Sequence, residues 1–363
     1  TRRSSDLVFG TRGFPNVQGG VEKHCEQLYP ELSDKYHITI FRRKAFLPVE
    51  RDGELKLPFQ FINLPSTRIK GFESFYHSFL CTLYCIIKRP DLVHIHNIGP
   101  GMFIPLLKLT RIKTILTYHS PNYEHQKWNF LAKKILKASE WLATNWADAI
   151  IFVNKKQVNR FKTAIRNKST YIPNGVHIQS RTTATDRIEK LGIQPNHYVL
   201  AVGRITQEKG LDYLIDAFLQ SKHKNIKLVL AGGIDHASSY AKKIIDKAKN
   251  TDIIMAGYAD GEYLRQLYSN ASLFVLSSYN EGFPLVLLEA MSYHLPLLAS
   301  DIPANKQLNL DNDSYFETGN ISELANKLTY KLSGTNSVSY DLSEYTWTRI
   351  AYLTNTVYRK VLD

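Results

Sequence analysis

Two acidic residues flank a short segment whose composition suits the binding of a nucleotide. Glu281 and Glu289 lie eight positions apart, and Gly282-Phe283-Pro284 directly follows the first of them. Pro284 suits the first turn of a helix, because its missing N–H would be unpaired there anyway. The N–H groups that open such a helix, beginning with that of Leu285, can bind a phosphate.

The two carboxylates would then have separate tasks around one helix start. Glu289, one to two turns inside the helix, can accept the protons of two ribose hydroxyls, and Glu281 can reach hydroxyls of a sugar attached beyond the phosphates. Two acids at this spacing are also common as solvated charges on a loop and a helix. The Gly-Phe-Pro sequence and the helix start favour the binding of a nucleotide sugar.

The same segment resembles the retaining glycosyltransferases of family 4, which have the two-domain GT-B fold. The resemblance rests on Glu281 to Glu289 followed by Ala290-Met291, and on Val202-Gly203-Arg204-Ile205 with Glu208-Lys209-Gly210 downstream. It extends over nearly the whole chain. It implies a sugar transfer from a nucleotide-diphosphate donor with retention of anomeric configuration. It also implies that Arg and Lys, rather than a metal ion, stabilise the leaving diphosphate.

The resemblance also assigns roles to individual residues. Arg204 and Lys209 would bind the donor diphosphate and stabilise it as it leaves, and fixed cations do lower the barrier to such a departure. Gly257-Tyr258 would line the base pocket, and Asn174-Gly175-Val176 would form the turn between the domains. The predicted catalytic residues are His119, Arg204, Lys209 and Glu281. The predicted donor-binding residues are Gly19, Gly20, Gly203, Gly257, Tyr258, Gly282, Phe283, Pro284, Leu285 and Glu289.

A glycine-rich segment near the start of the chain is a second candidate for phosphate contact. Residues 10–22 follow an expected strand, and Gly19-Gly20 stands directly before an expected helix. Two glycines there let backbone N–H groups come close to a phosphate. The segment is neither a Walker loop nor a spaced dinucleotide fingerprint. In the family that the chain resembles, this loop touches the donor phosphate or the acceptor.

Histidines provide further candidates. His119 ends an expected strand, at the edge where related enzymes have a His that contacts the donor sugar; a core or surface role is the alternative. Downstream, Glu124 and Lys127-Trp128 could border the acceptor. We expect His94 and His96 to face opposite sides of their strand and therefore not to share a metal ion.

No metal site is predicted elsewhere. Asp311-Asn312-Asp313 is similar to the metal-binding triplet of another glycosyltransferase fold, but it lies in a polar, turn-rich stretch and is interpreted as a turn. Cys81 and Cys85 lie four apart on an expected helix with no matching ligand pair. We interpret them, together with Cys25, as buried thiols of a reducing compartment.

The elements that must position these residues alternate between strands and helices, which is typical of parallel sheets covered on both faces. Expected strands are 6–9, 37–41, 92–95, 114–118, 149–153, 198–202, 228–231, 253–255, 273–276 and 296–299. Expected helices are 21–32, 72–87, 127–145, 210–220, 240–249, 262–270 and 347–362. We predict an α/β protein of GT-B fold, with two doubly wound Rossmann-like domains facing across a cleft. Residues 1–175 would bind the acceptor, residues 176–345 the nucleotide sugar, and residues 346–363 would form a helix that packs back on the N-terminal domain.

The charge of the chain is one-sided. Of the formal net charge of +13, residues 1–175 carry 27 Lys and Arg against 13 Asp and Glu, and residues 176–363 carry 19 against 20. A basic surface attracts polyanions, either nucleic acid or an anionic membrane. Residues 127–137 mix Lys with Trp and Leu at helical spacing, and residues 155–168 add six cations without an acid. We therefore predict peripheral binding to anionic lipids from the cytoplasmic side, with no secretory leader and no membrane-spanning segment.

Two other functions compete with sugar transfer. A nucleotide-sugar epimerase of the same fold would need acid–base groups on both faces of the sugar, and the sequence has no such extra cluster. A nucleic-acid-binding protein would suit the basic charge, but the aromatic and basic motifs of RNA-binding modules are missing. A cell-surface polysaccharide or lipopolysaccharide pathway, with a glycan or lipid-linked acceptor, is favoured; the donor's base and sugar are open.

Overall fold

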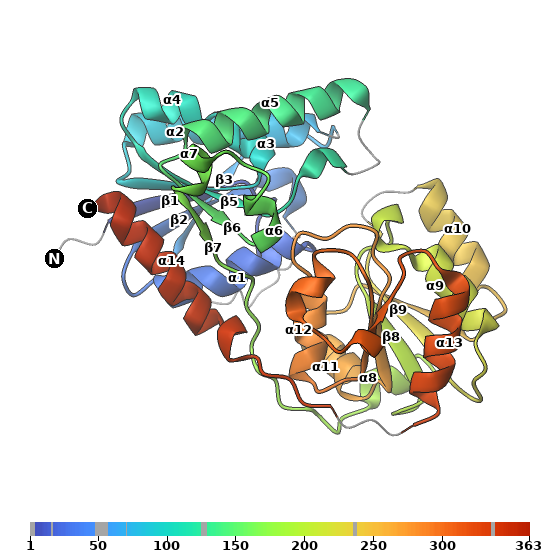
Figure 1. Ribbon diagram of the computed structural model, residues 1–363. Coiled ribbons are helices and arrows are strands. Elements are labelled where there is room, and N and C mark those ends of the chain that lie inside the picture. Colours follow the sequence, from blue (N-terminus) through green and yellow to red (C-terminus); the bar gives the residue numbers. More distant parts are fainter. Residues whose placement is uncertain are drawn as a thin grey trace. The chain divides into compact units, whose positions relative to one another are not determined.

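The structure of the protein is a computed structural model that describes residues 4–15, 17–47, 57–69, 71–124, 129–234, 238–334 and 338–363. These residues divide into two compact units (Figure 1). Unit 1 comprises residues 1–175 and 345–363, so the C-terminal segment belongs to the same unit as the N-terminal half. Unit 2 comprises residues 176–344.

Unit 1 contains a parallel sheet of seven described strands in the order β3-β2-β1-β4-β5-β6-β7. The strands are β1 Ser5–Phe9, β2 His37–Arg43, β3 Gln60–Leu64, β4 Leu92–His96, β5 Lys113–Tyr118, β6 Ala149–Phe152 and β7 Ser169–Tyr171. The helices are α1 Gly20–Leu32, α2 Phe72–Lys88, α3 Ile98–Gly101, α4 Ile104–Leu109, α5 Phe130–Trp146, α6 Lys155–Val158, α7 Thr163–Arg166 and α14 Trp347–Leu362. Central strands such as β4 are buried along their whole length, as expected for a sheet covered on both faces.

Unit 2 repeats the plan with six described strands in the order β10-β9-β8-β11-β12-β13. The strands are β8 Tyr198–Val202, β9 Lys227–Ala231, β10 Ile253–Gly257, β11 Leu273–Leu276, β12 Leu297–Ser300 and β13 Tyr315–Phe316. The helices are α8 Asp186–Glu189, α9 Leu211–Gln220, α10 Ser239–Ala248, α11 Gly261–Ser269, α12 Leu285–Ser292 and α13 Ile321–Leu332. Its core is formed by apolar side chains of the sheet and of α9, α10 and α13.

Each sheet changes winding direction once, and this point decides where ligands can bind. In unit 1 the change falls between β1 and β4, and in unit 2 it falls between β8 and β11. In doubly wound sheets the crevice at the carboxyl ends of such a strand pair is the usual ligand site. The loops that follow β8 and β11 contain Lys209 and Glu281, so the topology brings these distant residues to one edge.

All ten expected strands are present, but three edge strands, helix α13 and the short helices α3, α4, α6, α7 and α8 were not predicted. Strands β3, β7 and β13 are short outer strands whose pairing is set by their neighbours rather than by local pattern. Helix α13 had a readable start signal, because the side chain of Asn320 accepts a hydrogen bond from the backbone N–H of Glu323 at 3.0 Å. Helix α5 begins at Phe130, three residues later than predicted; Lys127-Trp128 lies outside the described residues.

Candidate functional site

The centre of the candidate site in unit 2 is an ion pair between two loops. Lys209 follows β8 and Glu281 follows β11, and Lys209 Nζ lies 2.5 Å from Glu281 Oε1. Their side chains are only 17% and 13% exposed. A pair so far removed from water is strong only with further hydrogen bonds, and Ser278 Oγ donates to the same carboxylate oxygen at 2.6 Å.

The loop that holds Glu281 is fixed by a chain of buried polar contacts. Ser300 Oγ, at the end of β12, donates to the carbonyl of Ser278 at 2.6 Å, and Asn305 Nδ2 donates to the carbonyl of Ser300 at 2.8 Å. On the other side, Ser277 Oγ donates to the carbonyl of Lys209 at 2.8 Å. The ion pair therefore has a prearranged position, as a binding site requires.

Backbone geometry provides room around Lys209. A Cβ atom on Gly203 would lie 3.3 Å from Lys209 Cε, so glycine at this position leaves room for the lysine side chain. Arg204, the next residue, is partly buried. Gly257 ends β10 with a φ of +70°, a backbone conformation that favours glycine, and Tyr258 directly after it is 46% exposed.

Helix α12 begins at Leu285, four residues after Glu281 in the sequence. Pro284 is the N-cap residue, so the proline stands one residue before the predicted first turn. Glu289 lies within the helix and is half-buried. Its Oε2 accepts a hydrogen bond from the hydroxyl of Tyr268 at 2.8 Å. The ring of Tyr268 stacks on Tyr293 at 5.2 Å, which holds this hydroxyl in place.

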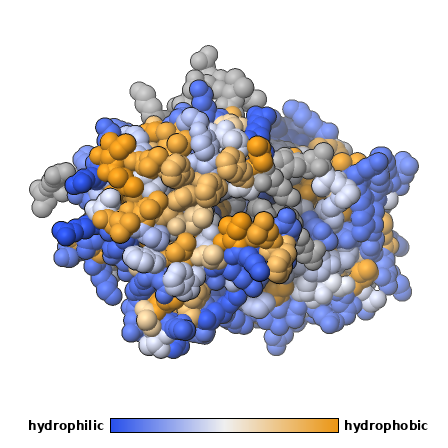
Figure 2. Space-filling model, turned by 90° about the horizontal axis from the view of Figure 1, so that it is seen from above, coloured by the Kyte–Doolittle hydropathy of each residue, from blue (hydrophilic) through white to orange (hydrophobic). Residues whose placement is uncertain are grey.

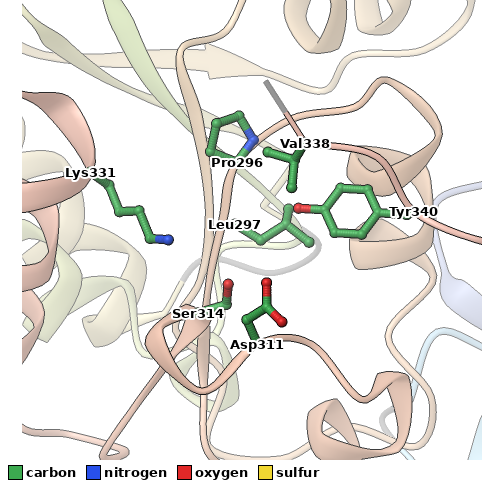
Figure 3. Close-up of a pocket in the computed structure, with 7 residues that line it drawn as sticks. All are labelled: Pro296, Leu297, Asp311, Ser314, Lys331, Val338 and Tyr340. Carbon is green, nitrogen blue, oxygen red and sulfur yellow. The ribbon is translucent and has the colours of Figure 1, made fainter. Parts of the chain in front are cut away.

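A cavity of unit 2 lies elsewhere (Figure 3). Its lining residues are Pro296, Leu297, Asp311, Ser314, Lys331, Val338 and Tyr340. None of the predicted site residues contributes to it. Asp311 precedes the 3₁₀ turn Asn312–Ser314, so the stretch interpreted as a turn is one.

In unit 1 the glycine turn lies at the start of α1. Gly19 is the N-cap residue and Gly20 the first residue of the helix. A Cβ atom on Gly20 would meet nothing within 4 Å, so packing within the described chain does not require glycine at this position. The backbone N–H of Arg12 donates to Glu22 Oε1 at 2.9 Å, which ties the turn to the helix.

Next to this turn lies a buried set of histidines that the sequence only partly predicted. His119, after β5, is 6% exposed, and its Nε2 is hydrogen-bonded to Nδ1 of His96 at 3.0 Å. His24 of α1, which was not singled out, packs edge-on against His119 with ring centroids 5.0 Å apart. Its Nδ1 is hydrogen-bonded to Asn174 Oδ1 at 2.8 Å.

The expectation that His94 and His96 face opposite sides of the strand is wrong. Their rings stack with centroids 4.5 Å apart, and both contact the hydroxyl of Tyr29, at 3.1 and 2.6 Å. Residues two positions apart on a strand share a face, and this period would have given the correct answer. His94 Nδ1 is also hydrogen-bonded to the hydroxyl of Tyr358 in α14 at 2.7 Å.

Burial keeps these rings neutral. It lowers the pKa of His24 to about 4 and that of His94 to about 3, and it lowers the pKa of His96 and His119 well below the usual value. In each case burial is the largest cause, since a charged imidazolium would lose its hydration. His119 can therefore offer a neutral hydrogen bond but not a positive charge near neutral pH.

Three of these rings could also hold a metal ion. One nitrogen each of His24, His96 and His119 lies within 4.8 Å of the other two. A tetrahedral Zn²⁺ with bonds of about 2.0–2.1 Å needs its ligands closer together than that limit, at roughly 3.4 Å. The hydrogen bond between His96 and His119 would have to open first.

The three cysteines are free and buried, and they form no disulfide with one another. In the part of the chain that the structure describes, no helix is both long enough and apolar enough to span a bilayer.

Comparison with known proteins defines the class of the protein. Residues 18–180 match the family described as Glycosyltransferase Family 4, and residues 184–346 match Glycosyl transferases group 1. The two parallel sheets and these matches are those of a glycosyltransferase of GT-B fold. The chain belongs to glycosyltransferase family 4.

Individual relatives agree with this assignment. The chain is 21% identical over 337 residues to the amylovoran biosynthesis glycosyltransferase AmsD of Erwinia amylovora, which covers 91% of this chain and 90% of AmsD. Sucrose-phosphate synthase from Thermosynechococcus elongatus superposes with a TM-score of 0.82 at 22% identity, over 99% of both chains. HepE of Anabaena in complex with UDP and glucose gives a TM-score of 0.77 at 17% identity, over 99% of this chain and all of HepE.

Proposed function

We propose that this glycosyltransferase moves a sugar from a nucleotide-diphosphate donor to a glycan or lipid-linked acceptor, with retention of anomeric configuration and without a metal ion. The observation that carries the proposal is the shielded pair of Lys209 and Glu281 beside the start of α12. The cation and the helix N-terminus suit the two phosphates of a sugar diphosphate, and the carboxylate suits the hydroxyls of its sugar.

The donor would exchange partners with the ion pair. Lys209 turns from Glu281 to the diphosphate, assisted by Arg204, and the freed carboxylate of Glu281 accepts hydrogen bonds from the sugar hydroxyls. Glu289 binds the ribose hydroxyls, with Tyr268 fixing its orientation. Gly257 and Tyr258 line the base pocket, and the backbone of Gly282, Phe283, Pro284 and Leu285 faces the phosphates.

Transfer breaks the bond between the anomeric carbon and the diphosphate oxygen and forms one to the acceptor oxygen on the same face of the sugar. The acceptor proton passes to the leaving phosphate. Negative charge grows on that phosphate, and Lys209, Arg204 and the α12 dipole stabilise it. In unit 1, His119 would donate or accept a neutral hydrogen bond to the sugar, and Gly19 and Gly20 would let the backbone approach a phosphate or the acceptor.

The acceptor is proposed to belong to a cell-surface polysaccharide; the relative AmsD is named as a glycosyltransferase of amylovoran biosynthesis. The buried free cysteines and the one-sided positive charge support a cytoplasmic location at the inner face of a membrane. Nucleic acid is not the proposed polyanion.

The decisive experiment joins donor screening with stereochemistry. Thermal-shift assays against UDP-, GDP- and dTDP-sugars identify the donor, because a ligand that binds only the folded state raises the melting temperature. The anomeric configuration of the product, measured by NMR, should be that of the donor, and EDTA should leave the rate unchanged. An inverted product would overturn the retaining assignment, and donor consumption without an acceptor would favour an epimerase.

A further inference from the structure

Helix α2 turns much of its apolar surface to solvent, while Tyr84 and Ile86 pack against the core. Its buried side chains are polar or small: Glu73, His77, Ser78, Cys81, Thr82 and Cys85. Its exposed side carries Phe72, Phe75, Phe79, Leu83 and Ile87, which are 48%, 44%, 38%, 40% and 78% exposed. A surface helix of a globular protein normally turns its apolar stripe to the core and its polar stripe to water. The exposed apolar stripe of α2 is therefore available for contact with another apolar surface.

The exposed residues of α2 form one continuous stripe, because they recur every three or four positions. Helix α4 extends this stripe with Leu106 and Leu109, which are 39% and 76% exposed. The buried ring of Phe103, just before α4, joins the two helices, with ring centroids 5.3 Å from Phe75 and 5.9 Å from Phe79. We call the five residues of α2 and the two of α4 the docking face. Figure 2 shows a broad apolar area on the side of the molecule that carries these helices.

Most charges around the docking face are positive, although Asp91, two residues after Arg89, is an exposed acid. Exposed cations follow or flank it at Lys88, Arg89 and Arg111, and Lys134 and Lys137 lie on the neighbouring helix α5. The acids of α2, α4 and α5 are Glu73 and Glu140, and both are engaged inside unit 1. Glu73 is buried with its carboxylate 3.9 Å from Arg43, and Glu140 accepts hydrogen bonds from Tyr118 and Tyr123.

We propose that the docking face binds an anionic lipid bilayer, with the apolar stripe at the boundary between headgroups and acyl chains and the cations at the lipid phosphates. A helix with an apolar face and Lys or Arg at its border binds in this way. A second copy of the chain would cover the apolar residues too, but symmetric pairing would bring like charges together. A bilayer with anionic headgroups satisfies both features.

This inference deepens the proposed function, because it names the surface at which a lipid-linked acceptor would be met. Attraction by the basic segments brings the protein to the membrane, and the apolar stripe of α2 holds it there. Binding should therefore have a component that survives high salt, since screening weakens the ionic contacts but not apolar burial.

The test is co-sedimentation of the full chain with phosphatidylcholine vesicles, with and without phosphatidylglycerol. The variant Phe75→Ser/Phe79→Ser/Leu83→Ser should lower partitioning to anionic vesicles by about tenfold or more, because its apolar anchor is gone. Arg89→Glu/Arg111→Glu should remove the preference for anionic over neutral vesicles. Tyr330→Ser, at a tyrosine of α13 that is 68% exposed, is the matched control and should bind like the wild type.

Two readouts keep the outcomes separate. Thermal stabilisation by the donor should be the same in the triple variant and the wild type, which shows that the variant is folded and that the donor site is intact. Equal vesicle binding by the triple variant, or no binding by the wild type, overturns the proposal. So does a concentration-dependent dimer that only the triple variant loses. A protein that binds vesicles but transfers no sugar would contradict the proposed function but would still support membrane binding by the docking face.

Discussion

The two units hold their polar groups in opposite ways. In unit 2 the charges of the candidate site, Lys209 and Glu281, sit on loops at the sheet edge and keep some contact with solvent. In unit 1 the candidate groups are neutral histidine rings deep among strands and helices, and His119 is linked to others through His96. Lys209 can exchange its partner Glu281 for a diphosphate, which suits the binding of a donor. Neutral, fixed rings suit orientation and shape, so the comparison predicts large effects on chemistry in unit 2 and smaller, structural effects in unit 1.

The largest effect is expected at Lys209. Lys209→Ala removes the cation that would stabilise the leaving diphosphate, and kcat/KM should fall by about 10²–10³-fold, as for the loss of one strong transition-state contact. Lys243→Ala is the matched control, since Lys243 forms an exposed ion pair with Asp212 at 2.9 Å. Steady-state kinetics of both variants measure the difference. A Lys209 variant with wild-type kinetics would show that the ion pair is only structural.

Glu289 should matter for binding more than for rate. Glu289→Gln keeps an acceptor for Tyr268 but loses the charge that would hold the ribose hydroxyls, so KM for the donor should rise about tenfold with kcat nearly unchanged. Glu262→Gln, on the exposed side of α11, should leave both constants as they are. A fall in kcat of Glu289→Gln without a change in KM would place this residue in the transition state instead.

The same contrast explains what the sequence could and could not predict. The donor-side residues stand in two short segments after strands, and a parallel sheet must bring the ends of neighbouring strands together. The resemblance to family 4, together with the position of both residues after strands, was therefore enough to predict that Lys209 and Glu281 lie close together. Their ion pair itself was not predicted, because it depends on loop conformations held by contacts such as Ser300 to Ser278.

In unit 1 the informative contacts join residues far apart in the chain. His24 meets Asn174, and His94 meets Tyr358, across 150 and 264 positions. No local sequence pattern predicts hydrogen bonds between residues so far apart in the chain. Helix α2 was predicted with nearly its observed bounds, but its mixed composition does not reveal which side faces the core. That choice is made by the elements that pack against it.

Acid should weaken unit 1 through its buried rings. The pKa of His24 is about 4 in the folded protein and near 6.5 unfolded, so the unfolded chain binds more protons between these values and stability falls as the pH drops through that window. This ring alone accounts for about 2 kcal/mol between pH 8 and pH 5. Asp6 opposes the trend, because burial raises its pKa to about 7, and the free-energy penalty of its buried charge disappears as the carboxyl is protonated toward acid.

Urea denaturation at the two pH values measures the difference, and His24→Asn should reduce it. The histidines outnumber Asp6 in unit 1, so net stability should fall toward acid. Stability that instead rises from pH 8 to pH 5 would show that Asp6 outweighs the histidines, and the buried rings would then not govern the acid response of unit 1.

The smallest effect tests whether the histidine set is more than structural. Tyr358→Phe removes one hydrogen-bond partner of His94 Nδ1, while Tyr29 remains, so the free energy of unfolding should fall by about 1 kcal/mol. Tyr352→Phe, on the same helix and 58% exposed, should change nothing measurable. If the rings only hold His119 in place, kcat of Tyr358→Phe should stay within about twofold of the wild type, because His96 still bonds His119. A larger loss of kcat at unchanged stability would mean that the state of His119 depends on the far end of the chain of rings, and unit 1 would then share the chemistry that the comparison assigns to unit 2.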